Sequence, residues 1–332
     1  MRAGEFSLFA ARSAILLPMR KIVLIYNPMA GKNLERRLSQ VESAAQVLRA
    51  AGVEARTVAT EAAGSGGQQA REAIAAGYDT VLACGGDGTV HDVLQGLVGS
   101  DVALGVIPLG TGNSLGNDLG LSRNPVRAAQ EIVESEPRRI ALGRVEFPNG
   151  ARSTPSPRYF IVRAGAGVDA RMLYPRNVAA KQWSGMAAYY AEAARLFLTH
   201  RFQRFEVEWH DHVGEKQRAE VTQVMAVRLR QFGGIIRWLA PDAALESADL
   251  QLVLFRTASR ISYSLYLLRA LLEQRWKTPG VDLVSASEAI CRPIPGKPSG
   301  NIYTEADGEL VGGLPVRFST VANALMLLMP KK

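Results

Sequence analysis

Hydrophobic and polar positions follow two periods in the first part of the chain. Short apolar runs of strand length alternate with segments in which apolar residues recur at helical spacing. The predicted strands are 20–26, 53–58, 78–83 and 103–107, and the predicted helices are 34–48, 68–76, 90–98 and 125–134. Alternating strands and helices predict a three-layer α/β domain with a parallel sheet.

After Pro137 the pattern changes to strand-length runs joined by turns. The predicted strands are 140–147, 159–164, 205–209, 221–227 and 250–255. Strands joined in this way predict a mainly antiparallel β-sandwich. Two predicted helices, 184–198 and 262–276, interrupt it, and their apolar faces fit either ordinary core or the border of a lipid channel.

Glycine-rich polar turns follow three of the predicted strands. The most informative is the run 84–90, Cys-Gly-Gly-Asp-Gly-Thr-Val, and the others are 27–33 and 108–114. Glycines at a strand-to-helix turn let backbone N–H groups approach an anion, and the helix N-terminus adds its dipole. Because the carboxyl ends of parallel strands share one edge of the sheet, these turns predict a common phosphate site. The spacing is neither that of a Walker A loop nor that of a G-x-G-x-x-G fingerprint.

These turns, together with Ala306-Asp307-Gly308-Glu309 near the end of the chain, resemble the diacylglycerol kinase catalytic-domain family. That family includes bacterial lipid kinases and is related to diacylglycerol and sphingosine kinases. The GGDGT run alone is shared with NAD kinases and phosphofructokinases, whereas the turns at 27–32 and 108–113 are typical of the lipid-kinase branch. The resemblance covers about residues 20–330. It implies a lipid kinase that uses ATP and Mg²⁺ to phosphorylate a lipid hydroxyl, with diacylglycerol or a related lipid alcohol as the acceptor.

The resemblance also implies roles for individual residues. The positions that match ATP-binding residues of the family are Asn27, Thr60, Gly85, Gly86, Asp87, Gly88, Thr89 and Thr111. Asp87 is also the expected contact of the metal bound with ATP. Glu309 is the expected catalytic base, and the second catalytic residue, Asp307, would orient it or share its proton. On an extended strand both carboxylates would project to one face. Asp169 is an expected contact of the lipid site.

The fold that the resemblance implies agrees with the pattern: an α/β domain like those of NAD and diacylglycerol kinases, followed by a β-sandwich. We expect an N-terminal extension over 1–19, an ATP-binding domain over 20–137 and a β-sandwich lipid and catalytic domain over 138–319. The last apolar run, about 320–330, would return to the first domain. For residues 1–19, an upstream extension and an amphipathic membrane anchor both stay open.

Charge and composition bear on partners and location. Among 332 residues the formal net charge is +8, which favours an anionic membrane surface. Nucleic acid is not expected because no recognition motif is visible, and no apolar run is long enough for a transmembrane segment. Cys84 and Cys291 fit buried thiols in a reducing compartment. We therefore expect a cytoplasmic protein peripherally associated with the membrane; a homodimer stays open. His91 is expected on a helix surface, with a ligand contact as the alternative.

Three departures from the family pattern mark a divergent member. Ser114 stands where many relatives have Asp, and Asp118 lies one helical turn later. Many bacterial members bind a structural magnesium through an Asp-Gly turn; the matching place, 246–249, lacks that pair. Arg228 opens the segment where an asparagine is usual. A sphingosine-type long-chain-base kinase and a weakly active lipid-binding protein therefore remain alternatives, and NAD kinase is a weaker one because its substrate motif is not visible.

Overall fold

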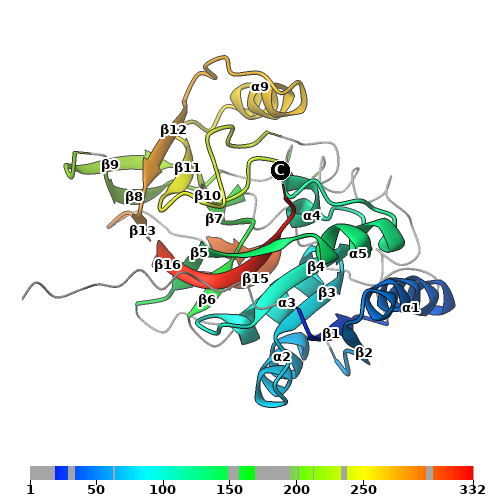
Figure 1. The fold of residues 1–332 in the computed structure, drawn as a ribbon. Coiled ribbons are helices and arrows are strands. Elements are labelled where there is room, and N and C mark those ends of the chain that lie inside the picture. Colours follow the sequence, from blue (N-terminus) through cyan, green and yellow to red (C-terminus); the bar gives the residue numbers. More distant parts are fainter. Residues whose placement is uncertain are drawn as a thin grey trace, which may run out of the picture.

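The computed structural model describes residues 19–28, 34–62, 64–148, 157–168, 202–211, 213–232, 238–296 and 302–331, together with 195, 197 and 199 (Figure 1). The predicted helix 184–198 therefore lies almost entirely outside the described residues, as do Asp169 and residues 1–18.

The first part of the chain forms parallel strands with helices between them. The strands are β1 (Lys21–Tyr26), β2 (Glu54–Ala59), β3 (Thr80–Gly85) and β4 (Ala103–Pro108), and their order in the sheet is β2-β1-β3-β4. The helices are α1 (Leu34–Ala50), α2 (Gly66–Ala75), α3 (Asp87–Leu97), α4 (Ser114–Asp118) and α5 (Pro125–Val133). α5 begins as predicted, because the Asn124 side chain accepts hydrogen bonds from the backbone N–H groups of Val126 and Arg127.

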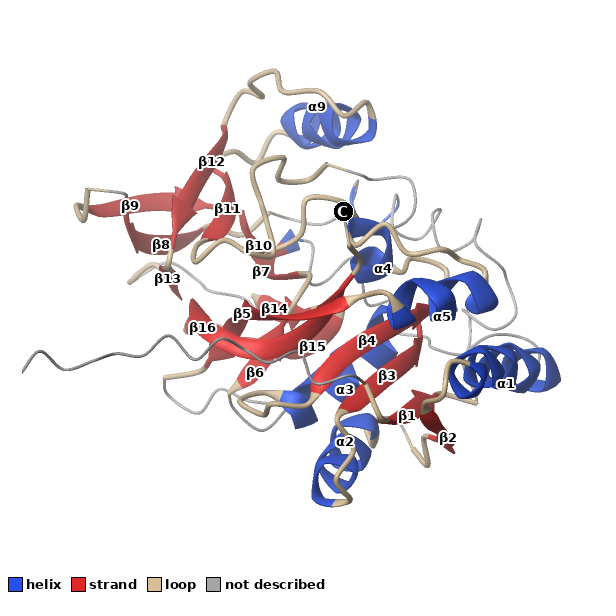
Figure 2. Cartoon of the chain, in the orientation of Figure 1, coloured by secondary structure: helices blue, strands red, loops and turns tan. Residues whose placement is uncertain are grey.

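Side chains that alternate along β1 show why this part has three layers. Ile22 and Leu24 pack in one cluster with residues of α1 and α5. Val23 and Ile25 pack in another cluster with residues of α2 and α3. Successive residues of a strand point to opposite faces, so a strand buried on both faces needs a helical layer on each side. The predicted three-layer α/β arrangement is confirmed (Figure 2).

The second part of the chain is mainly antiparallel, as predicted. Its remaining elements are β5 (Glu136–Glu146), β6 (Arg158–Phe160), β7 (Arg163–Gly167), β8 (Phe205–His210), β9 (Lys216–Val221), β10 (Gln223–Val227), β11 (Leu250–Phe255), α9 (Arg260–Leu271), β12 (Val281–Ala286), β13 (Glu288–Arg292), β14 (Tyr303–Ala306), β15 (Glu309–Gly313) and β16 (Val316–Met329). One sheet has the order β12-β11-β10-β7-β14-β15. Its buried face packs with β5, β8, β13 and β16, and the aromatic rings of Phe160, Phe205 and Phe318 fill the sandwich core.

The last strand, β16, connects the two parts. It pairs with β5 and β13 in antiparallel fashion, and its Met326 and Leu327 lie parallel to Ala103 and Leu104 of β4. A single ten-stranded sheet therefore runs from the parallel strands into the sandwich. β5 begins at Glu136, beside the domain boundary expected from the sequence.

The helix expected over 262–276 is shorter in the structure. α9 begins at Arg260, where the Ser259 side chain caps it, and ends at Leu271. Glu273 follows with a φ of 55°, a left-handed conformation that ends the helix.

Candidate active site

A cleft of about 450 Å³ opens where β1, β3 and β4 end. Its walls are formed by Asn27, Arg37, Thr60, Ala62, Gly66, Gly86, Gly88, Thr89, Asp92, Leu109, Gly110, Thr111 and Glu309. The cleft is of the size that small-molecule ligands use. It lies at the carboxyl edge of the parallel strands, where ligands bind in open α/β sheets.

Two glycine turns form the floor of this cleft by touching each other. A Cβ atom on Gly110 would lie 2.4 Å from the Cα of Gly86, and the Leu109 N–H donates to the Gly85 carbonyl at 2.9 Å. A Cβ on Gly85 would collide with Thr89 in the next turn of chain. The glycines are therefore required for backbone packing as well as for access of a ligand to the backbone.

Helix α3 begins directly at the cleft. Its N-cap is Gly86, which offers no side chain to the first helical N–H groups. Unsatisfied N–H groups and the positive end of the helix dipole favour an anion at this place. Gly88 and Thr89, in the first turn, line the cleft, and a Cβ atom on Gly88 would meet nothing within 4 Å.

Asp87 lies under the glycine turns and does not line the cleft. Its Oδ1 accepts a hydrogen bond from the Ser114 N–H at 2.6 Å, and a Cβ on Gly112 would lie 2.6 Å from its Oδ2. Burial raises the pKa of this carboxyl, the Ser114 amide lowers it, and the charge of Asp307 raises it further. Ser114, one of the departures from the family pattern, thus contacts Asp87 through its backbone. Asp118 instead accepts from the Gln231 N–H at 2.7 Å.

Two charged residues in the cleft were missed by sequence reasoning. Arg37 of α1 is nearly buried, and its Nη1 donates to the Leu109 carbonyl at 2.6 Å. Asp92 of α3 accepts from the Gly64 N–H at 3.1 Å, and burial raises the pKa of its carboxyl. For Asp92, which lies five positions after Asp87 and so about 140° further around the helix, the spacing gave no signal. For Arg37, the contact with residue 109 has no local signal.

The Asp307-Gly308 pair forms the turn of the β14–β15 hairpin. Their φ angles are 49° and 88°, and Ala306 pairs with Glu309 across the turn. Two consecutive positive φ angles are typical of a type I′ turn, for which Asp-Gly is a preferred pair. The expectation that Asp307 and Glu309 project to one face of an extended strand is therefore wrong. Asp307 turns inward, whereas Glu309 lines the cleft.

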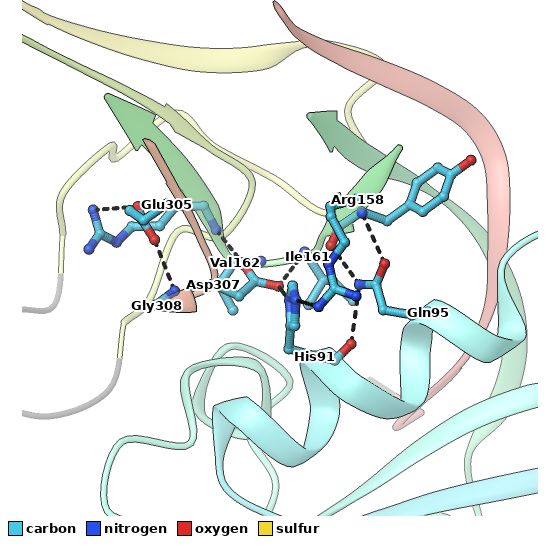
Figure 3. A network of polar contacts seen from close by, with 10 residues as sticks. His91, Gln95, Arg158, Ile161, Val162, Glu305, Asp307 and Gly308 are labelled. Atoms are coloured by element: carbon cyan, nitrogen blue, oxygen red, sulfur yellow. Dashed lines mark hydrogen bonds and ion pairs between the residues drawn. The ribbon is translucent and has the colours of Figure 1, made fainter. Parts of the chain in front are cut away.

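The carboxylate of Asp307 binds the chain between β6 and β7. It accepts hydrogen bonds from the backbone N–H groups of Ile161, Val162 and Arg163 at 3.0, 2.9 and 3.0 Å. The other side of the turn is held by buried Glu305, which accepts from the Gly308 N–H at 2.9 Å (Figure 3). With these contacts Asp307 is suited to position the turn, and it is too enclosed to meet a substrate directly.

His91 completes this network and corrects a second expectation. Its ring is fully buried, not on the helix surface, because β6 covers this side of α3. Nδ1 of His91 lies 3.2 Å from Oδ2 of Asp307, and Nη2 of Arg158 lies 2.9 Å from Nε2 of His91 (Figure 3). A guanidinium can only donate, so Nε2 accepts and the ring proton sits on Nδ1, facing the carboxylate. His91 thus links α3 to the hairpin that carries Glu309.

Gln95, one turn further along α3, also connects this helix to β6, through the backbone of Tyr159. Its side chain donates to the Tyr159 carbonyl at 2.8 Å and accepts from the Tyr159 N–H at 3.1 Å (Figure 3). Helix α3 is therefore connected to β6 and to the hairpin by polar groups that are buried or partly buried.

The structure gathers most of the predicted site residues around one cleft. Of the expected ATP-binding set, the residues that line it are Asn27, Thr60, Gly86, Gly88, Thr89 and Thr111. Gly85 and Asp87 support the floor from beneath, and Asp169 lies outside the described residues. Glu309 reaches the cleft from the other part of the chain.

Two protein families match this chain. Residues 21–145 match the diacylglycerol kinase catalytic domain. Residues 162–329 match the YegS C-terminal NAD kinase beta sandwich-like domain. The two matches together span nearly all of the described chain.

Individual relatives match this chain over nearly its whole length. The chain is 29% identical to a diacylglycerol kinase of Bacillus subtilis (strain 168) over 318 residues, which is 95% of this chain and 98% of that protein. It is also 29% identical to a diacylglycerol kinase of Mycobacterium tuberculosis (strain ATCC 25618 / H37Rv) over 317 residues, 94% and 96% of the two chains.

Solved structures share the fold at lower identity. One from Bacillus anthracis str. Sterne aligns with a TM-score of 0.73 at 20% identity and covers 94% of this chain and 98% of its own. A second from the same strain, described as a diacylglycerol kinase, aligns with a TM-score of 0.68 at 20% identity over 93% and 97% of the two chains.

Proposed function

This chain belongs to the diacylglycerol kinase catalytic-domain family, and on that premise we propose that it transfers the γ-phosphate of ATP to the hydroxyl of a lipid. The acceptor we propose is diacylglycerol or a related lipid alcohol. Relatives that match over their full length are diacylglycerol kinases, which supports this substrate class.

One observation carries the proposal: Glu309 lines the same cleft as the glycine turns. The turns come from the parallel strands, whereas Glu309 comes from the hairpin of the sandwich. A phosphoryl transfer needs a place for the triphosphate and a base beside it for the acceptor hydroxyl. The cleft offers both within one volume.

In the proposed reaction, the lipid hydroxyl oxygen attacks the γ-phosphorus of ATP while Glu309 accepts the hydroxyl proton. A new oxygen–phosphorus bond forms, and the bond between the γ-phosphorus and the bridging oxygen to the β-phosphate breaks. ADP leaves with that electron pair. Asp307 and His91 act as positioning residues, because their hydrogen bonds fix the turn from which Glu309 extends.

Charge in the cleft supports the binding of a triphosphate. The Arg37 guanidinium lines the wall, and the N-terminus of α3 faces the same space. Mg²⁺ bound with ATP would neutralise charge that develops on the phosphates. It commonly uses only one or two protein carboxylates; Asp92 lines the cleft and would supply one, whereas Asp87, the contact expected from the sequence, lies beneath the glycine turns. Asn27, Thr60 and Thr111 would contact the nucleotide from the walls.

We propose that the protein acts in the cytoplasm at the surface of an anionic membrane. Within the described residues, no helix is long and apolar enough to cross a bilayer. α9 exposes Ile261, Leu265, Leu268, Leu271 and Leu272 to solvent. Residues 260–272 contain no acidic residue; Arg260 is the first residue of α9, and Arg275 and Lys277 follow beyond Glu273. An exposed apolar helix with cationic flanks fits an anionic lipid surface.

The deciding experiment is a phosphorylation assay of the whole chain with γ-labelled ATP. The acceptors are diacylglycerol, monoacylglycerol, sphingosine, ceramide and NAD, with the lipids presented in mixed micelles. We expect label in a phosphorylated glycerolipid. Label only in a long-chain base would identify a sphingosine-type kinase, and label only in NAD would remove the lipid from the proposal. Lipid binding without any transfer would support the alternative of a weakly active lipid-binding member.

A further inference from the structure

Arg228, directly after β10, is the largest fully buried side chain of the described residues, with 1% of its surface exposed. Its guanidinium donates four hydrogen bonds, and every acceptor is a backbone carbonyl. Nη1 donates to Ser247 and Asp249 at 2.8 and 2.9 Å. Nη2 donates to Ala141 and Leu245 at 3.0 and 2.7 Å.

These acceptors come from distant parts of the chain. Ala141 belongs to β5, and the other three belong to the irregular segment 245–249 that leads into β11. Successive turns shape this segment, with the Ala243 N–H bonded to Ala240 and the Ser247 N–H bonded to Ala244. Such a segment points several carbonyl oxygens toward one point, and carbonyl oxygens gathered in this way need a cation or a set of donors.

No carboxylate of the described residues forms an ion pair with this guanidinium. Glu246 pairs with Arg138 at the surface, 3.3 Å away, and Asp249 is exposed. Burial lowers the pKa of Arg228 to about 10, and the side chain of Asp249 acts on Arg228 only through its charge, which raises that pKa. The guanidinium is therefore a full cation at neutral pH.

The resemblance to bacterial lipid kinases implies a structural magnesium at this place, and the residues present do not fit one. The described residues hold no group of three His, Cys, Asp or Glu side chains able to bind a metal. The converging carbonyl oxygens already bind a positive charge that a second cation would repel. Two sequence departures, the changed segment that begins at Arg228 and the missing Asp-Gly at 246–249, thus meet at one point in the fold.

We infer that Arg228 is a built-in structural cation that replaces the divalent metal of this position. Its planar fork ties β5, β10 and the segment before β11 together by the contacts that a metal would otherwise make. The sandwich of this protein therefore needs no divalent ion to fold, and Mg²⁺ is needed only together with the nucleotide.

The first test is the thermal midpoint of the nucleotide-free whole chain in excess EDTA and in excess MgCl₂, measured by circular dichroism. We expect the same midpoint in both. A midpoint that falls in EDTA, in the absence of any nucleotide, would overturn the inference.

Variants of Arg228 give the second test. Arg228→Met leaves four buried carbonyls without their donor, and we expect its midpoint to fall by on the order of 10 °C. Arg228→Lys keeps the charge with fewer, differently placed donors, so its midpoint should lie between those of Arg228→Met and the wild type. The control is Arg230→Met, which removes an exposed arginine from the same segment and should leave the midpoint nearly unchanged.

A third measurement uses Arg228→Ala, which opens a space lined by carbonyl oxygens. We expect Ca²⁺ or Mg²⁺ to raise the midpoint of this variant while leaving the wild type unchanged. If Arg228→Met and Arg228→Lys both keep the wild-type midpoint, the guanidinium has no such role. If Arg228→Met does not fold, the comparison of wild type with Arg228→Lys and the EDTA measurement still decide the question. None of these readouts uses phosphoryl transfer, so they stand apart from the proposed reaction.

Discussion

The Nδ1 nitrogen of His91 lies 3.2 Å from Oδ2 of Asp307, and both side chains are shielded from solvent. The two residues are 216 positions apart in the chain. One belongs to the helix that begins at the glycine turn, and the other forms the turn before Glu309. Their contact fixes the distance between the proposed phosphate site and the proposed base.

We therefore expect His91→Leu to lower kcat on the order of 10²-fold, because a small displacement of a catalytic group has effects of that size. The KM for ATP should stay nearly unchanged, since His91 does not line the cleft. His91→Asn restores a donor and should recover part of kcat. His210→Leu, at the exposed end of β8, is the control. If His91 served only the stability of the fold, His91→Leu would have a lower melting midpoint and a normal kcat.

Glu309→Gln tests the proposed base directly. The amide keeps the size of the side chain and cannot accept the hydroxyl proton, so turnover on the true lipid should fall roughly 10²–10⁴-fold. ATP binding, measured by calorimetry, should remain close to the wild-type value. Glu288→Gln in β13, far from the cleft, is the matched control. Near-normal turnover of Glu309→Gln would remove this residue from the mechanism.

Arg37→Met tests the positive wall of the cleft. A charge-assisted hydrogen bond to phosphate is worth about 1.5–3 kcal/mol, so the affinity for ATP should fall roughly 10-fold to 100-fold. Arg36→Met, at the exposed neighbouring position, should change the affinity little. If both variants bound ATP as tightly as the wild type does, Arg37 would not contact the triphosphate.

Asp92→Asn should stabilise the free protein at neutral pH. Burial raises the folded-state pKa of Asp92 above its usual value, so ionisation of this carboxyl begins to oppose folding as the pH rises above the unfolded-state pKa, and the cost is complete above the folded-state pKa. The amide keeps the acceptor for Gly64 and removes the charge. The gain in melting midpoint should be present at pH 7 and disappear below about pH 4, the usual range of an aspartate. Asp101→Asn, an exposed control, should show no such pH-dependent gain; an equal gain at every pH would contradict the electrostatic origin.

The exposed face of α9 predicts how the protein meets a membrane. Leu268→Asp with Leu272→Asp places two negative charges on an apolar, acid-free helix and should reduce co-sedimentation with anionic vesicles. Val213→Asp, at an exposed residue of the β8–β9 turn, is the control. Binding of the wild type should weaken as salt is added. Equal binding to neutral and anionic vesicles at low salt would count against an electrostatic contribution.

Much of the fold and of the cleft could be predicted from local patterns. β1, β3 and β4 carry continuous apolar runs because both of their faces are buried, and the glycine turns fall at their carboxyl ends. The Asp-Gly pair at 307–308 was also a readable signal for a two-residue hairpin, and treating it as extended strand caused the error about Asp307.

The remaining features depend on contacts between distant segments. His91 is buried only because β6 covers α3, and Arg37 reaches the cleft only because the Leu109 carbonyl receives it. Arg228 reads as a surface arginine until the segment 245–249 and β5 surround it. Side-chain polarity at one position cannot reveal a partner that lies more than 70 residues away.

β16 pairs with β4 although the two strands are far apart in the chain, and this pairing affects the order in which the fold can form. The strand beside β4 follows every other described strand in the chain, so the parallel sheet keeps an open edge at β4 until β16 has been synthesised. Contacts of such high sequence separation form late and slow the folding of a domain. A deletion of residues 325–329 would therefore destabilise the parallel sheet, although these residues are some 220 positions from Ala103 and Leu104. Newly made chains would need protection of that open edge until β16 emerges.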